Sequence, residues 1–116
     1  MAVIIPTFNT TLERLTTVTW ANLTTGDTAA VHAIRGKNDL LTMQAEGTFS
    51  GGTRITMTGS LSNVAFITAT DMTQTAIAFT SNGACGILEP FTYWKPTIAS
   101  GSSDSITVTL AYWKDE

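Results

Sequence analysis

The chain has 116 residues, a formal net charge of −3 and only 13% charged residues, against about 25% in an average globular domain. This length suits one domain with its own core, and six scattered Lys and Arg residues exclude a basic nucleic-acid surface. No apolar run approaches the roughly 20 residues of a membrane-spanning helix, and the single Cys85 excludes an intramolecular disulfide and a multi-cysteine metal site.

The first segment, residues 1–12, has no charged side chain and carries the apolar residues Val3, Ile4, Ile5 and Phe8. Pro6 lacks a backbone donor and suits an edge or a bend rather than a central strand. We therefore expect 1–12 to form an extended N-terminal arm or edge strand, followed by a single domain over 13–116. Two interpretations stay open: the arm docks into a groove or sheet edge of its own subunit, a sister subunit or a partner protein, or it is the first strand of its own domain.

The rest of the chain alternates short apolar–polar stretches with turn residues every 8–12 residues, a pattern typical of all-β sandwiches and barrels. Threonine, which is β-branched and suits strands, occurs 23 times. We predict a single antiparallel β-sandwich, jelly-roll-like, with almost no helix. The expected strands are 12–23, 28–34, 40–49, 54–58, 63–69, 75–80, 84–89, a short piece at 91–95 stopped by Pro96, and a last strand from Ile106 almost to the end.

The clearest local signal is Gly51-Gly52, which lies between two alternating stretches. Two glycines that adopt positive φ are typical of a tight hairpin, so a β-hairpin is predicted here. The apolar faces of the strands give the expected core, which consists of Met43, Phe49, Ile55, Met57, Phe66, Ile77, Phe79, Ile106, Val108 and Leu110.

Catalytic signatures are absent from the sequence. A nucleophilic triad would need His32, which lies in mid-strand with no nucleophile elbow nearby, so a surface or sheet-packing histidine is favoured. Cys85 lies between Ala84 and Gly86 and is expected to be an inert buried thiol. Glu46 and Glu89 could form a glycosidase-like pair only if the fold brought them together. We therefore predict no catalytic, cofactor-binding or metal-binding residues.

Three tryptophans, Trp20, Trp94 and Trp113, offer two interpretations. Exposed in a row, they would stack on sugar rings; buried, they would fill the core or a subunit interface, where aromatic side chains contribute most. We favour core or interface. The candidate interface residues are Val3, Ile4, Ile5, Phe8, Trp94 and Trp113.

A family resemblance rests on turn and strand motifs over about residues 18–111. The chain resembles small tailed-bacteriophage capsid decoration (cement or head-stabilising) proteins. Two departures are Leu61-Ser62-Asn63 followed by Phe66, where the family tends to have Asn-Asp-Gly and then tryptophan, and Lys95, where arginine is usual. The motifs that carry the resemblance are Val18-Thr19-Trp20-Ala21-Asn22-Leu23, Gly26-Asp27, Gly47-Thr48-Phe49, Gly51-Gly52-Thr53, Gly59-Ser60, Phe79-Thr80-Ser81-Asn82-Gly83, Glu89-Pro90, Lys95-Pro96-Thr97 and Ser105-Ile106-Thr107-Val108-Thr109-Leu110.

The resemblance implies a structural virion protein that is made in the host cytoplasm and binds the outer capsid surface. Its partners would be the major capsid protein and copies of itself, as a dimer or trimer, with no nucleic acid, membrane or cofactor. An alternative is a carbohydrate- or receptor-binding β-sandwich module of a virion fibre or spike. A hydrolase of unrecognised type is a third and weaker hypothesis.

Overall fold

A computed structural model describes residues 3–11, 15–34, 38–99 and 101–114. Within these ranges the chain contains strands and turns but no helix. The strands are β1 (Val3–Ile4), β2 (Thr7–Thr11), β3 (Leu15–Leu23), β4 (Thr28–Ala29), β5 (His32–Ala33), β6 (Asn38–Thr48), β7 (Arg54–Ser60), β8 (Ile67–Thr68), β9 (Gly83–Gly86), β10 (Tyr93–Ala99) and β11 (Ser105–Lys114).

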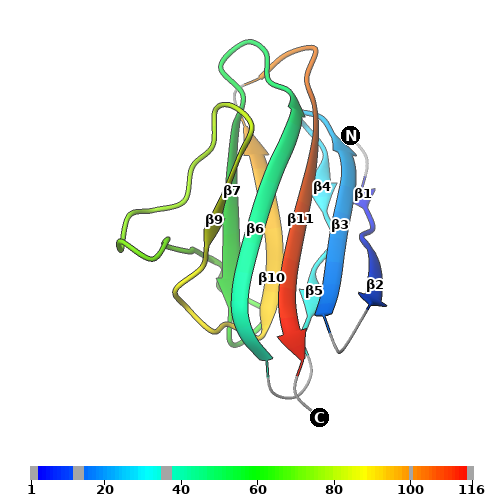
Figure 1. Cartoon of the computed structure of the whole chain (residues 1–116). Helices are drawn as coiled ribbons and strands as arrows, with labels where there is room; N and C mark the ends of the chain where they lie inside the picture. The colour runs from blue at the N-terminus through cyan, green and yellow to red at the C-terminus, as the bar shows by residue number, and fades with distance from the viewer. Residues whose placement is uncertain (1–2, 12–14, 35–37, 100, 115–116) are drawn as a thin grey trace.

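Two antiparallel sheets make up most of the structure. One has five strands in the order β2-β3-β11-β6-β9, and the other has four in the order β5-β10-β7-β8. Figure 1 shows the five-stranded sheet in front, with β7 and β10 behind it. A separate parallel pair joins β1 to β4. The prediction of an all-β chain with antiparallel sheets is confirmed.

The core is built from the inward faces of both sheets. Buried and more exposed side chains alternate over residues 15–20 of β3, 41–46 of β6, 54–57 of β7 and 105–113 of β11, as expected for strands with one face against the core. The side chains with no exposed surface include Val18, Trp20, Met43, Ala45, Ile55, Met57, Trp94, Ile106, Val108 and Leu110.

Most of the predicted core residues are buried. Ile77 also lies in the core, while Phe49 and Phe79 pack against it with part of their surface exposed. The prediction is wrong for Phe66, which is half-buried outside the core cluster. Its ring lies under the Lys95 ammonium, 4.6 Å from Nζ to the ring centroid, in a cation–π contact.

The N-terminal segment pairs within its own chain over residues 3–11. Val3 and Ile4 pair with Thr28 and Ala29, and Ala30 donates a backbone hydrogen bond of 2.8 Å to the Ile4 carbonyl. Farther along, β2 runs antiparallel beside β3. Of the two alternatives left open by the sequence, an edge strand of its own domain describes this segment.

The Gly51-Gly52 turn differs from the predicted hairpin. Both glycines have positive φ, 67° and 84°, as expected. The flanking strands do not pair, however, because β6 lies between β11 and β9, whereas β7 lies between β10 and β8. This turn therefore carries the chain from one sheet to the other.

Pro96 does not stop a strand, which corrects another prediction. It lies inside β10, opposite Met57 of β7. The Met57 carbonyl accepts a hydrogen bond from Ala69, on the side away from β10. Since the polar groups of Met57 point away from Pro96, the missing proline N–H costs no ladder hydrogen bond.

Three further differences concern weak strands. Residues 28–34 form two short strands, β4 and β5, instead of one. Of residues 63–69, only Ile67–Thr68 forms a strand, and Val64 is exposed on a loop. Residues 75–80 form isolated bridges, with Phe79 paired to Ile55 and Ala76 to Thr70.

A buried carboxylate joins three turns at one end of the sheets, the upper end in Figure 1. Asp104 accepts hydrogen bonds from the Thr25 N–H (2.9 Å), the Thr25 hydroxyl (2.6 Å) and the Thr53 hydroxyl (2.7 Å). Gly101 fits this cluster because a Cβ there would lie 2.0 Å from Asp104 Oδ2. We call Thr25, Thr53, Gly101 and Asp104 the Asp104 cluster.

Candidate functional site

His32 contacts an aromatic side chain of the opposite sheet. Its Nε2 lies 3.1 Å from the hydroxyl of Tyr112, which is buried at the end of β11. Burial raises the pKa of the Tyr112 hydroxyl. This contact links β5 of one sheet to β11 of the other, which supports the packing role of the two that the sequence left open.

Cys85 lies in β9 opposite Met43 and packs against the core with part of its surface exposed. Burial raises the pKa of its thiol, and the negative charge of Asp71 adds to this effect. A raised pKa keeps the thiol protonated at neutral pH, and the thiol is a poor nucleophile. Cys85 thus lacks the environment of a catalytic cysteine.

Glu89 is engaged by a neighbouring loop residue. Its carboxylate accepts hydrogen bonds from the backbone N–H of Thr70, at 2.8 Å, and from the Thr70 hydroxyl. Burial acts to raise the pKa of Glu89, but these hydrogen bonds outweigh it and the pKa lies below its ordinary value. A general acid needs a raised pKa, so Glu89 is unsuited to that role. Glu46 is exposed on β6, opposite Thr107.

Other kinds of site have little support. Among the residues that the structure describes, no three His, Cys, Asp or Glu side chains gather in a group that could hold a metal ion. The same part of the chain has no helix long and apolar enough to cross a membrane.

The tryptophans do not form an exposed row. Trp20 and Trp94 are fully buried, and their indole N–H groups donate to the carbonyls of Ala30 and Phe91, each at 2.8 Å. Only Trp113 is exposed, to 42%. Trp94 is therefore a core residue, and this corrects its place among the candidate interface residues.

The apolar N-terminal residues divide by position. Val3 and Ile5 are 65% and 75% exposed, whereas Ile4 is half-buried and packs against the core. Phe8 lies opposite Val18 in the β2–β3 register, and its side chain falls outside the described part of the chain. Two N-terminal candidates thus face solvent, and Ile4 serves the protein's own core.

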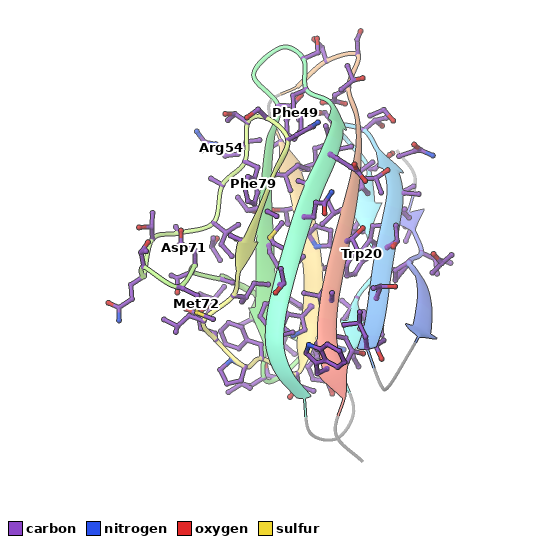
Figure 2. All side chains as sticks on the ribbon, in the orientation of Figure 1. Trp20, Phe49, Arg54, Asp71, Met72 and Phe79 are labelled. Carbon is purple, nitrogen blue, oxygen red and sulfur yellow. The ribbon has the colours of Figure 1, made fainter. Side chains whose placement is uncertain are left out.

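A second group of exposed apolar side chains was missed by the sequence reasoning. They lie on the irregular segment around β8 and just after β9, and Figure 2 shows Met72 on the loop that projects from this side. Assigning 63–69 to a strand concealed Val64 and Ile67, because a strand pattern assumes that one face is buried. The residues are Leu61, Val64, Ile67, Met72 and Leu88.

The outer face of the five-stranded sheet is polar but nearly uncharged. Thr19, Thr109 and Gln44 lie side by side across β3, β11 and β6, on the face opposite the core. The next positions along these strands continue the pattern. The face includes Thr17, Thr19, Thr42, Gln44, Glu46, Thr107, Thr109 and Ala111, all exposed or half-exposed.

Comparisons with known proteins give no further guide: no family model, no curated protein and no solved structure matches the chain.

Proposed function

We propose that this protein is a structural virion component that binds the outer surface of a phage capsid and stabilises the shell by bridging major capsid protein subunits. In this proposal it acts as a homo-oligomer, a dimer or trimer, and has no enzymatic activity. Its two sheets form a β-sandwich, with jelly-roll-like connections. The observation that carries the proposal is the outer face of the five-stranded sheet, which offers hydroxyl groups and very few charges.

The physical argument concerns desolvation. A charged side chain loses strong hydration when a partner covers it, whereas a threonine hydroxyl loses much less and keeps a methyl group for packing. The threonines of β3 and β11 can therefore be covered by another protein at low cost. The turn motifs resemble those of capsid decoration proteins, and this resemblance supports the capsid shell as that partner.

Within this proposal, the exposed candidates Val3, Ile5 and Trp113 provide apolar anchors for the partner. Large apolar side chains that become fully covered contribute most of the binding energy at protein interfaces. Ile4 and Trp94 contribute indirectly, by fixing the strands that carry the anchors.

The proposal is tested by co-sedimentation of the purified protein with capsid shells made of the major capsid protein. We expect Ile5→Asp to weaken shell binding by about tenfold or more, because a charge would replace an apolar anchor. The unfolding free energy should change by less than about 0.5 kcal/mol, since the side chain is mostly exposed. Val64→Asp, in the loop between β7 and β8, is the matched control and should bind like the wild type.

Two results would contradict the proposal. Failure of the wild-type protein to co-sediment with shells would remove the capsid as partner. Binding of a glycan that Trp113→Ala abolishes would favour the fibre or spike module instead. For that alternative, the structure offers one exposed tryptophan, Trp113, rather than a row of three.

A separate prediction concerns chemistry. His32→Ala and Cys85→Ser should leave shell binding unchanged, because both side chains pack inside this protein and neither has the environment of a catalytic group. Co-sedimentation of both variants measures this directly. A hydrolytic activity of the purified wild-type protein that either substitution abolished would overturn the prediction and restore the enzyme hypothesis.

A further inference from the structure

The five-stranded sheet ends in an open edge at β2. Among the described residues, β2 pairs with β3 and with no other strand. Figure 1 shows β2 at the right-hand margin of the sheet, with no strand beyond it. An unpaired edge presents backbone N–H and C=O groups that another strand can bind.

The hydrogen-bond alternation across the sheet identifies the groups at this edge. The Ile87 N–H donates to the Leu41 carbonyl. In this part of β6, the backbone N–H and C=O groups of the odd-numbered residues therefore point toward β9. The backbone groups of the even-numbered residues of β6 therefore point toward β11, and Gln44 forms a hydrogen-bonded pair with Thr109. It follows that, in this part of β11, the backbone groups of the even-numbered residues point toward β3.

The same alternation continues from β11 through β3 to β2. Leu110 lies opposite Val18, so these two residues form a hydrogen-bonded pair. The backbone groups of the odd-numbered residues of β3 therefore point toward β2. Thr17 lies opposite Asn9, which makes this pair the hydrogen-bonded one. Phe8 and Thr10 consequently point their backbone N–H and C=O groups away from β3, toward the open edge.

The other sheet edges are short or covered. β5 and β8 have two residues each. The edge just after β9 is covered by residues 70–71: Asp71 pairs with Ile87, and the Leu88 N–H donates to the Thr70 carbonyl. Pro96 removes a donor from the outer side of β10. In the described part of the chain, β2 is thus the longest open edge without a proline.

The composition of β2 suits a copy of itself. Thr7–Thr11 contains no charge, so two such strands would meet without repulsion, and it lacks the lysine or proline that commonly blocks edge pairing. An antiparallel pair of identical strands has two-fold symmetry, the commonest symmetry of homo-oligomers.

We propose that β2 pairs antiparallel with β2 of a second copy, around a two-fold axis at Asn9, which joins the two five-stranded sheets into one. In this register Phe8 exchanges two hydrogen bonds with the partner's Thr10, and Thr10 does the same with the partner's Phe8. A register centred on Phe8 would instead place Thr10 opposite the partner's Pro6, which has no N–H. The proposal gives the homo-oligomer of the proposed function a specific surface, and its test uses purified protein without shells, so the two can fail separately.

Disulfide cross-linking tests the register, in a Cys85→Ser background. Asn9→Cys places two thiols at the two-fold axis, where paired Cα atoms lie about 4.5 Å apart, within the range of a disulfide. We expect a covalent dimer on mild oxidation. Thr7→Cys is the matched control, because its two copies would lie about 13 Å apart along the strands and should not cross-link. Equal cross-linking of both variants, or none with Asn9→Cys, would overturn the register.

Sedimentation equilibrium tests the pairing itself. The wild type should dimerise, and Thr10→Pro should weaken the dimer by about tenfold or more, because it removes an outward N–H from each strand. Thr10→Pro takes no hydrogen bond from the β2–β3 ladder, so circular dichroism at a concentration where both proteins are monomeric should show an unchanged melting temperature. A wild type that stays monomeric at about 100 µM, or a Thr10→Pro variant that dimerises equally well, would overturn the proposal.

Discussion

Replacing Trp20 with alanine is expected to lower the free energy of unfolding by about 3–5 kcal/mol, the range for large aromatic residues deleted from a core. The Trp20 side chain has no exposed surface and lies among core residues of both sheets (Figure 2). Its indole also donates a hydrogen bond of 2.8 Å to the Ala30 carbonyl, between β4 and β5. The substitution therefore leaves a cavity and removes a link to that segment. Urea unfolding followed by circular dichroism measures the change.

Two control variants separate the parts of this effect. Trp20→Phe keeps most of the buried apolar surface but loses the N–H, so it should cost less than Trp20→Ala. Trp113→Ala removes a tryptophan that is 42% exposed and should have a much smaller effect. If Trp20→Ala unfolds at the same urea concentration as Trp113→Ala, the assignment of Trp20 to the core is wrong.

Removing the carboxylate of Asp104 is the second large change that we expect. Hydrogen bonds to a charged group contribute about 1.5–3 kcal/mol each, and they do not add fully, so Asp104→Ala should cost about 3 kcal/mol. Asp104 accepts two hydrogen bonds from Thr25 and one from Thr53. Its loss would leave the turn at 24–27, the turn at 49–53 and the segment before β11 without their common partner.

The same carboxylate predicts a pH dependence. Hydrogen bonds from Thr25, with a further one from Thr53, hold the pKa of Asp104 below its ordinary value of 3.8, although burial acts in the opposite direction. The unfolded chain thus takes up a proton before the folded one does. This contribution to stability is fully present above pH 4 and is lost as the pH falls through the lowered pKa of the folded state.

Urea midpoints of the wild type and Asp104→Asn at pH 7 and pH 3 measure this contribution. The wild type should lose more stability on acidification than the variant. Asp71→Asn is the matched control: the pKa of Asp71 is also lowered, by hydrogen bonds from Thr73 and Thr75, but these stay within one exposed loop. An Asp104→Asn variant with the same acid sensitivity as the wild type would contradict the role of this carboxylate.

The sequence predicted the strands whose side chains alternate over many residues. Ile106, Val108, Leu110 and Tyr112 share one face of β11, and all four are buried. Such an alternation specifies which face is buried without reference to the rest of the chain. The pairing of strands has no such local signal, which is why the Gly51-Gly52 turn was predicted as a hairpin although it connects two sheets.

Predictions failed where distant parts of the chain decide the local structure. Pro96 fits inside β10 because the polar groups of Met57 face Ala69, which is 27 residues before Pro96 in the sequence. Val64 is apolar yet exposed, and a strand pattern cannot reveal that no sheet covers it.

The candidate site shows the same division between local and distant information. The exposure of Val3 and Ile5 agrees with their choice as interface candidates from composition. Trp94 was misplaced, because a buried and an exposed tryptophan look alike in sequence. The Asp104 cluster could not be predicted at all, since Thr53 and Thr25 lie 51 and 79 residues from Asp104.

The position of β11 has a consequence for how the chain folds as it is synthesised. This strand is the last of the described chain, yet it lies between β3 and β6 in the middle of the five-stranded sheet. A chain leaves the ribosome N-terminus first, so β3 and β6 emerge before the strand that separates them. Until β11 follows, the edges of β3 and β6 that will pair with it stay unpaired, and their apolar faces stay exposed. Synthesis of β11 thus completes the sheet, and any pause in translation before Ser105 prolongs the exposure of these strands to aggregation.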